Sequence, residues 1–196
     1  MDICSILCKI EESVFSVYNE CYETKGGGYL SRLIRRATVD DTAQVSNVYV
    51  KSLKSTFHGI FSEGYLSKLT PETSYEQWKK NIENPNNLVL VLEHNREIVG
   101  MIVGAFVDQE GVTSIQGNIL AVYIQPDYKK MGYGKKLVAA LFEEFKKRNI
   151  TKCVAKVFKN NKNKGFFEHV GGVLVDEQPL DEAHVISIFV YSWDRI

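Results

Sequence analysis

The fold is decided by the stretch Leu120-Ala121-Val122-Tyr123-Ile124-Gln125-Pro126-Asp127-Tyr128-Lys129-Lys130-Met131-Gly132-Tyr133-Gly134-Lys135-Lys136-Leu137. It predicts a strand that ends near Gln125, a loop with two glycines, and a long helix that begins at once. Main-chain N–H groups at a helix start have no internal partner, the helix dipole is positive there, and glycines let a phosphate come close. Four lysines add positive charge: Lys129, Lys130, Lys135 and Lys136. The stretch therefore predicts a local anion site.

Two common phosphate loops do not fit this stretch. A nucleotide P-loop needs a glycine where Lys129 stands, and it needs Ser or Thr after Lys135. A dinucleotide fingerprint needs a third glycine where Leu137 stands. A plain strand-to-helix turn with solvated lysines remains the alternative to a phosphate site.

Outward from this turn, hydrophobic periodicity predicts an α/β domain without internal repeats. The expected elements are a strand at 32–37, helices that start near Asp40 and near Thr73 or Ser74, strands at 88–93, 98–107 and 114–125, a helix at 132–148, a strand at 152–158, a helix at 161–170, and strands at 172–177 and 185–193. Trp78, Trp193 and Cys153 are interpreted as core residues.

The first 28 residues are expected to form an amphipathic helix and a glycine linker. Apolar residues from Ile3 to Cys21 recur at three- and four-residue steps, and Gly26-Gly27-Gly28 follow. Such a stripe needs a cover, so the helix is expected to dock on the main domain, 29–196, or to join two copies in a homodimer.

Composition narrows the classes of function. The chain has 196 residues, which suits one domain, and Lys+Arg and Asp+Glu both count 24. This balance gives no general attraction to nucleic acid or to a membrane surface. The four cysteines lack C-x-x-C spacing, so no metal site or disulfide framework is expected. Without a basic leader or a long apolar run, we expect a cytoplasmic protein.

The residues around the glycine turn resemble the GNAT superfamily of N-acetyltransferases. The family's cofactor motif, Gln/Arg-x-x-Gly-x-Gly/Ala, is similar to Lys129-Lys130-Met131-Gly132-Tyr133-Gly134. A second family segment, Asn-x-x-Ala-x-x-Phe-Tyr-Glu-x-x-Gly, resembles 160–171, and the likeness covers residues 33–193. The resemblance implies a mixed, mostly antiparallel central sheet with helices on both faces.

The resemblance also implies acetyl-CoA as co-substrate, bound along the strand end, the glycine loop and the second segment. The implied cofactor residues are Val122, Tyr123, Ile124, Lys129, Lys130, Met131, Gly132, Tyr133, Gly134, Lys135, Asn160, Asn163 and Phe167. A main-chain N–H at a strand bulge near 122–124 is expected to polarise the thioester carbonyl.

Four positions depart from the family pattern. Lys129 replaces the motif's Gln or Arg and Asn163 replaces its Ala, and both changes are tolerable. Phe167 replaces the Tyr that protonates the departing thiolate, and Asn118 stands where many relatives have a Glu that acts as the general base. The catalytic residues are therefore unknown, with Tyr123, Asn118 and His169 as weak candidates. Further candidates for a replacement acid or base are Tyr133, His58, Tyr49 and Glu93, and for each an ordinary packing or surface role remains the alternative.

The expected acceptor site lies around the loop 52–69, where Phe57, Phe61, Glu63 and Tyr65 are concentrated. The predicted function is transfer of an acetyl group from acetyl-CoA to a primary amine of a small molecule (polyamine, amino compound or drug) or to a peptide N-terminus. The amine is expected to attack directly in a ternary complex. The alternative is a non-catalytic acyl-CoA-binding regulatory module.

Overall fold

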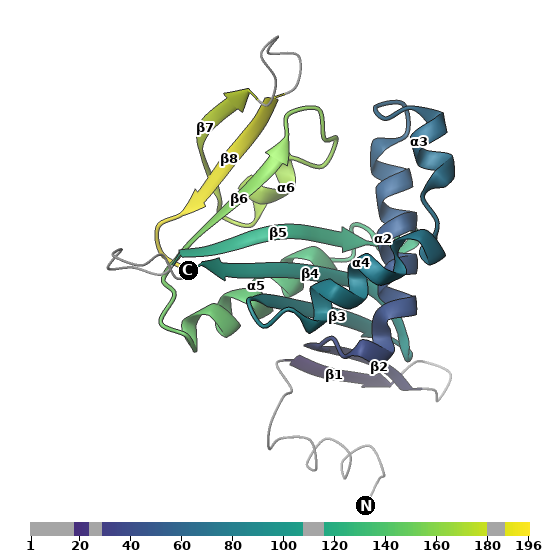
Figure 1. The fold of residues 1–196 in the computed structure, drawn as a ribbon. Helices are drawn as coiled ribbons and strands as arrows, with labels where there is room; N and C mark the ends of the chain where they lie inside the picture. The colour runs from purple at the N-terminus through teal and green to yellow at the C-terminus, as the bar shows by residue number, and fades with distance from the viewer. Residues whose placement is uncertain (1–17, 24–28, 108–115, 180–186) are drawn as a thin grey trace, which may run out of the picture.

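The computed structural model describes residues 18–23, 29–107, 116–179 and 187–196, and they form one twisted sheet with helices on both faces (Figure 1). The eight strands lie in the order β1-β2-β3-β4-β5-β6-β8-β7, and every neighbouring pair is antiparallel except β5 and β6. Their bounds are β1 Tyr18–Glu23, β2 Tyr29–Arg36, β3 Asn87–His94, β4 Glu97–Val107, β5 Gln116–Ile124, β6 Lys152–Phe158, β7 Val173–Pro179 and β8 Ser187–Trp193. The expected mixed, mostly antiparallel α/β sheet is confirmed.

Each face of the sheet has its own hydrophobic core. Helix α5 (Tyr133–Lys146) covers one face and packs with the short helix α6 (Gly165–His169). Helices α2 (Thr42–Phe57) and α4 (Pro71–Glu83) cover the other, and Figure 1 shows α4 in front of the strands with α5 behind them. Trp193 and Cys153 are buried in the α5 core and Trp78 in the α2 core, as predicted.

The expected N-terminal helix does not extend over Tyr18–Glu23, which form strand β1. This segment pairs with β2 from Tyr18↔Ile34 to Glu23↔Tyr29. Pairing with β2 gives its main-chain groups partners, and Tyr and Cys fit an extended chain. The segment therefore belongs to the sheet of the main domain, while 1–17 and 24–28 lie outside the described residues.

Helix boundaries differ from expectation between β2 and β3. Helix α3 (Glu63–Lys68) was expected as loop, and it begins after Ser62, whose side chain accepts from Tyr65 N at 3.3 Å. Helix α4 is capped by Thr70, three residues before the expected Thr73, because Thr70 and Thr73 exchange side-chain and main-chain hydrogen bonds. These short capping signals lie in a polar stretch that carries little hydrophobic periodicity.

Helix α6 is shorter than predicted and begins at Gly165 instead of residue 161. The main-chain N–H of Asn163 donates to Asn161 Oδ1 at 2.8 Å, which holds the preceding residues in a turn. The asparagines of this segment thus form a loop that leads into the helix.

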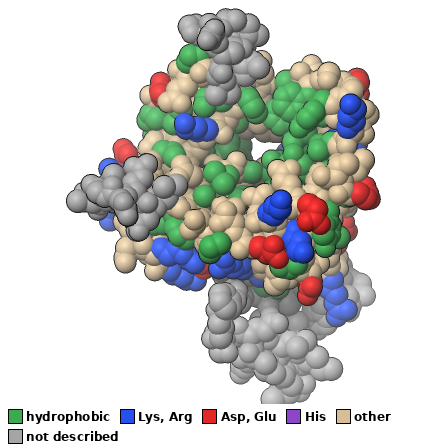
Figure 2. Space-filling view, viewed as in Figure 1, with side chains coloured by type: hydrophobic (Ala, Val, Ile, Leu, Met, Phe, Trp, Pro, Cys, Tyr) green, Lys and Arg blue, Asp and Glu red, His purple; other side chains and the backbone are tan. Residues whose placement is uncertain are grey.

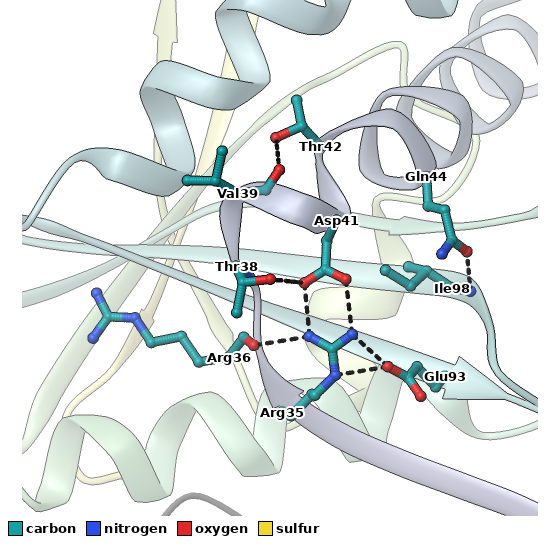
Figure 3. A network of polar contacts seen from close by, with 9 residues as sticks. All are labelled: Arg35, Arg36, Thr38, Val39, Asp41, Thr42, Gln44, Glu93 and Ile98. Carbon is teal, nitrogen blue, oxygen red and sulfur yellow. Dashed lines mark hydrogen bonds and ion pairs between the residues drawn. The ribbon is translucent and has the colours of Figure 1, made fainter.

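A network of charges fixes the start of α2 (Figure 3). Arg35 on β2 donates to both carboxylate oxygens of Asp41, at 2.7 and 2.8 Å, and its Nε donates to Glu93 Oε1 at 2.6 Å. Burial by itself would raise the pKa of Asp41, but hydrogen bonds from Arg35 and Thr38 outweigh it, so that this pKa is lowered. Glu93 therefore has a structural role here, and its role as a catalytic base stays a prediction.

No helix in the described ranges is long and apolar enough to cross a membrane.

Candidate functional site

The two central parallel strands separate and form a fork. Strands β5 and β6 pair only from Gln116↔Lys152 to Ile119↔Ala155, although both continue further along the chain. Figure 1 shows β6 rising away from β5 beyond this point. Because the pairing ends at Ile119, the later main-chain groups of β5 on this side have no strand neighbour among the described residues. The fork is an open edge in the middle of the sheet.

A bulge in β5 lies directly beyond the last pair of the fork. Val103 pairs with Ala121, while the next residue, Gly104, pairs with Ile119, so Leu120 is the inserted residue. The expected bulge was placed at 122–124, two residues too late. Leu120 has ordinary strand preferences, so nothing in its residue type marks the position. Its side chain is 53% exposed.

The bulge and the strand alternation determine which amides face the fork. Gln125 N donates to Val99 O at 2.8 Å, so this residue directs its main chain toward β4. Since alternate residues of a strand point to opposite neighbours, Val122 and Ile124 direct their main-chain groups into the fork. Ser52 from α2 donates its hydroxyl to Ile124 O at 2.8 Å, which agrees with this direction. The N–H groups of Val122 and Ile124 are the donors that the fork offers.

The glycine loop follows β5 without interruption. A single turn at Pro126–Tyr128 leads to Lys130 and Gly132, both with positive φ, 63° and 79°. Gly132 is the N-cap of α5, no side chain caps this helix, and its first internal bond is Lys136 N to Gly132 O, 3.2 Å. In the described chain, the main-chain N–H groups of Tyr133, Gly134 and Lys135 meet no protein acceptor. The predicted turn is therefore an open row of donors at the positive end of a helix.

Tyr133 anchors this turn with its side chain. The ring is buried, its hydroxyl lies 3.1 Å from His94 Nδ1, and the guanidinium of Arg32 lies over the ring at 5.4 Å. The side chain of Tyr133 is therefore engaged on the α5 side of the sheet, and its main-chain N–H is the group that it contributes to the open turn. Its hydroxyl is not placed to serve as an acid for the fork.

The lysines of the loop differ in their surroundings. Burial lowers the pKa of Lys129, whose Nζ lies 3.5 Å from Ser55 Oγ at the end of α2. Lys130 and Lys135 are exposed. The loop thus touches α2 on one side and presents free positive charge on the other.

The second predicted segment, 160–167, meets the glycine loop in space. A Cβ atom on Gly134 would lie 2.8 Å from the ring of Phe166, so glycine at this position lets α5 and α6 approach. The side-chain amide of Asn163 donates to Thr56 Oγ1 at 3.4 Å, and Asn160 is exposed nearby in sequence. The structure therefore brings together, around the end of α2, the two segments that are predicted to bind the cofactor.

Phe167 does not point its ring at an open site. It is 8% exposed and stacks on Tyr191 with ring centroids 5.6 Å apart. Tyr191 in turn donates its hydroxyl to Glu168 at 3.0 Å. Neither ring supplies a proton donor that is free for the fork.

The other candidate acids and bases are scattered. Asn118 is half-buried and pairs with Ala105 and Val154, in the part of β5 that is still hydrogen-bonded on both sides. His169 is exposed at the C-terminal end of α6. His58 and Glu63 are exposed and face each other, with Nε2 and Oε1 3.6 Å apart.

Tyr123 is the candidate that lies at the fork, on the face covered by α2 and α4. Its ring packs edge-on against Tyr49 and Trp78, with centroids 5.3 and 6.2 Å away. Burial raises the pKa of Tyr123 well above its usual value, and the neighbouring Tyr49 and Tyr65 add to the effect. A hydroxyl in this environment stays protonated, so it can donate a hydrogen bond and cannot serve as a base near neutral pH.

The outer end of the fork is open and apolar. Figure 2 shows an opening between the part formed by β6, β7 and β8 and the part formed by α2 and α3, bordered by hydrophobic side chains. Phe158 at the end of β6 contacts Phe57 and Phe61 edge-on, with centroids 6.1 and 6.3 Å away. The fork therefore has a polar row of amides on one flank and aromatic rings on the other.

Several residues of this site had no individual role in the sequence prediction. Ser52, Ser55 and Thr56 lie within the expected region 52–69 and contact the fork or its loops from α2, and Leu120 forms the bulge. Ser52 is buried among the apolar residues of α2, so a polar residue on that stripe is its sequence signal. Ser55 and Leu120 are exposed and Thr56 is half-buried, and nothing in their residue types separates them from surface positions.

Comparison with known proteins gives a consistent result. The model of the "Acetyltransferase (GNAT) family" matches residues 50–190. Among curated proteins, the chain is similar to a spermidine N(1)-acetyltransferase from Thermoplasma acidophilum, 26% identical over 151 residues, 74% of this chain and 89% of that protein.

Solved structures agree with this match. The PaiA N-acetyltransferase from Thermoplasma acidophilum, in complex with coenzyme A, superposes with a TM-score of 0.65 and 22% identity, covering 82% of this chain and 97% of the other. A ribosomal-protein-alanine N-acetyltransferase from Brucella melitensis gives 0.64 and 20%, covering 82% and 98%. These two likenesses establish the fold. The coenzyme A in the first structure agrees with acetyl-CoA as the expected co-substrate of this family.

Proposed function

The chain belongs to the GNAT family of acetyltransferases, and from that premise we propose that it transfers an acetyl group from acetyl-CoA to a primary amine in a ternary complex. The acceptor is an amine of a small molecule or, as a second class, a peptide N-terminus. The observation that carries the proposal is the continuity of the fork with the row of open amides at the start of α5.

The diphosphate of acetyl-CoA is bound by the amides that begin α5. The N–H groups from Met131 to Lys135 provide the donors, and the exposed Lys130 and Lys135 add charge. The neighbouring segment with Asn160 and Asn163 borders the same ligand. From there the pantetheine arm runs along the unpaired side of β5, where the main-chain groups of Val122 and Ile124 are its partners.

The reaction breaks the C–S bond of the thioester and forms a C–N bond. The unprotonated amine attacks the carbonyl carbon, coenzyme A leaves as a thiolate, and the proton lost by the nitrogen balances the one that the thiolate takes up. An N–H of the fork, such as that of Val122, stabilises the charge on the carbonyl oxygen. A thiol has a pKa of about 8.5, so the thiolate departs without a strong general acid. Phe167 is therefore compatible with turnover.

A binding module without catalysis is the second candidate, because Phe167 is packed against Tyr191 and Asn118 lies in the paired part of β5. Mixing acetyl-CoA with a panel of primary amines and measuring free thiol separates the two functions. Amine-dependent thiol release, together with an acetylated product by mass spectrometry, supports transfer. Acetyl-CoA binding without turnover across the panel would establish the module.

A dimer and a role of 1–28 in assembly stay predictions, which the mass in solution of a chain without these residues would test.

A further inference from the structure

An aromatic cluster lies beside the fork, on the sheet face that carries α2 and α4. Tyr49 from α2, Trp78 from α4 and Tyr123 from β5 pack edge-on, with ring centroids 5.3, 5.3 and 6.2 Å apart. Tyr49 and Trp78 are buried, and Tyr123 is half-buried. Three separate elements thus converge on one group of rings next to the bulge in β5.

Tyr65 extends this cluster to the surface. It belongs to α3, its side chain is 51% exposed, and its ring meets Phe61 edge-on at 5.5 Å. Its hydroxyl is near enough to raise the pKa of both Tyr49 and Tyr123, in each case after the larger effect of burial. Phe61 also meets Phe158 edge-on at 6.3 Å, so Tyr65 belongs to the aromatic rings that border the open end of the fork.

One buried polar atom of this cluster has no partner in the protein. Within the described residues, the indole N–H of Trp78 is buried without a hydrogen-bond acceptor, and no hydrogen bond is made by the hydroxyls of Tyr49, Tyr65 and Tyr123. Buried polar groups are normally paired, so an unpaired N–H beside three uncommitted hydroxyls at an open fork indicates a place for a ligand.

We propose that Tyr49, Tyr65 and Tyr123 form the acceptor subsite, and that it takes a monoamine carried on an apolar or aromatic body in preference to a polyamine. This inference rests on the proposed function, because it assigns the second substrate of the same fork.

Phenol groups suit the nitrogen of an amine. The oxygen of a neutral tyrosine accepts a hydrogen bond from N–H, and the ring faces provide apolar contact for the carbon atoms. The raised pKa values of Tyr49 and Tyr123 keep both groups neutral, so the subsite offers hydrogen bonds without negative charge.

The lack of negative charge is what disfavours a polyamine. In the described parts of the chain, the rings of Tyr49, Tyr65 and Tyr123 contact other aromatic rings, and no ion pair or hydrogen bond joins them to a carboxylate. Glu63, the acidic residue of α3's first turn, is exposed and faces His58. A second or third ammonium group that enters this subsite would lose hydration without gaining an opposite charge, which is costly.

The same property assists the reaction. An ammonium group that leaves water for a neutral, apolar site has a lowered pKa, because burial disfavours the charged form. The subsite therefore favours the unprotonated amine that attacks the thioester, and the proton passes to solvent. This effect compensates for Asn118, which stands at the family's Glu position and cannot accept a proton.

The test compares 2-phenylethylamine with spermidine as acceptors. We expect kcat/KM for 2-phenylethylamine to exceed that for spermidine by about 10-fold or more, since burying an unpaired charge costs over 1 kcal/mol. Tyr65→Phe and Tyr123→Phe remove single hydroxyls, and each is expected to weaken 2-phenylethylamine binding by about 2- to 10-fold. Acetyl-CoA affinity should be unchanged in Tyr65→Phe, since Tyr65 is not one of the implied cofactor residues.

Tyr75→Phe on the exposed side of α4 is the matched control, since it removes a hydroxyl that contacts none of these residues. Dissociation constants of both amines are also measured by calorimetry with saturating coenzyme A, where no turnover is needed. A preference for spermidine would overturn the subsite. It would also be overturned if the Tyr65→Phe and Tyr123→Phe variants bound 2-phenylethylamine as tightly as Tyr75→Phe does. Loss of turnover with every amine would instead contradict the proposed function, while the binding data still decide the subsite.

Discussion

The two flanks of the fork are formed by different chemical groups. The flank at the start of α5 consists of main-chain N–H groups, a glycine with positive φ and a close helix contact at Gly134. The opposite flank consists of aromatic side chains from α2, α3, α4 and β5. A main-chain site depends on local geometry, while a side-chain site depends on distant elements meeting. The main-chain site can therefore be predicted from a short sequence motif, and the side-chain site can vary without changing the fold.

Helix α2 connects the two flanks. Its Ser52 reaches Ile124 O, and its last turn contacts Lys129 and Asn163 on both cofactor segments. The same helix carries Tyr49 on its buried side. Substitutions that act on the α5 turn alone should therefore have different effects from substitutions that displace α2.

The largest expected effect is that of Gly132→Asp on acetyl-CoA affinity. An Asp at φ 79° strains the N-cap of α5, and its charge repels a diphosphate at the same amides. Like-charge contacts cost several kcal/mol, so the dissociation constant should rise by at least about 100-fold. Calorimetry with acetyl-CoA measures this.

Gly59→Asp is the matched control for that experiment. Gly59 has φ 76° and open space around it, as Gly132 does, but it lies in the loop after α2. The two variants share the backbone strain and differ in location. Equal acetyl-CoA affinity in both would contradict a diphosphate site at the α5 turn.

The next effect is that of Asp41→Asn on the stability of the α2 side. The change leaves Arg35 without its carboxylate partner at the start of α2, and we expect a loss of about 2 kcal/mol, below the usual cost for a fully buried pair because Arg35 is partly exposed. Urea unfolding at pH 7 measures this. Amide exchange should rise more in α2 than in α5, and a uniform rise would count against a separate α2 flank.

The effect of Asp41→Asn on stability should also depend on pH. The folded-state pKa of Asp41 is lowered, so its contribution to stability is present above the unfolded value of about 3.9 and is lost as pH falls through the folded value. The stability difference between wild type and Asp41→Asn should therefore narrow below about pH 4. A constant difference from pH 7 to pH 3 would show that the carboxylate charge is not the cause.

A smaller effect on stability is expected at the contact between α5 and α6. Gly134→Ala adds a Cβ that would lie 2.8 Å from the Phe166 ring, and overpacking costs about 1 kcal/mol or more. In a Phe166→Leu background the clash is relieved, and the better helix propensity of Ala should then appear. A double-mutant cycle by urea unfolding should give a coupling energy of about 1 kcal/mol. Additive effects would mean that the α5 and α6 ends do not depend on each other.

The two flanks of the fork could be predicted from the sequence to different extents. The turn at Gly132 was placed correctly because a strand end, glycines and a helix start follow one another in the chain. A helix after Asn160 was also expected, but it begins at Gly165 because the residues around Asn163 form a turn. The order of strands from β2 to β8 followed from periodicity in the same way. These features depend on neighbours within about one turn or one strand.

The remaining features depend on tertiary contact. The stripe that included Tyr18 and Cys21 fitted a helix, but pairing with β2 decided in favour of a strand. Tyr133 and Glu93 are polar side chains near the predicted cleft in sequence, yet His94 and Arg35 hold them elsewhere. The bulge at Leu120 is set by the register between β4 and β5. No single segment contains the information for any of these.

The smallest expected effect concerns Cys153, which is buried in the α5 core beneath the fork. Burial raises the pKa of Cys153 to about 12, so at pH 8 about one molecule in 10⁴ carries a thiolate there. Cys153→Ser should therefore leave the number of fast-reacting thiols toward an aromatic disulfide reagent unchanged in the native protein. In guanidinium chloride the wild type should show one more reactive thiol than the variant. Fast reaction of Cys153 in the native state would mean that the paired part of β5 and β6 opens readily. The two flanks would then not share a rigid frame.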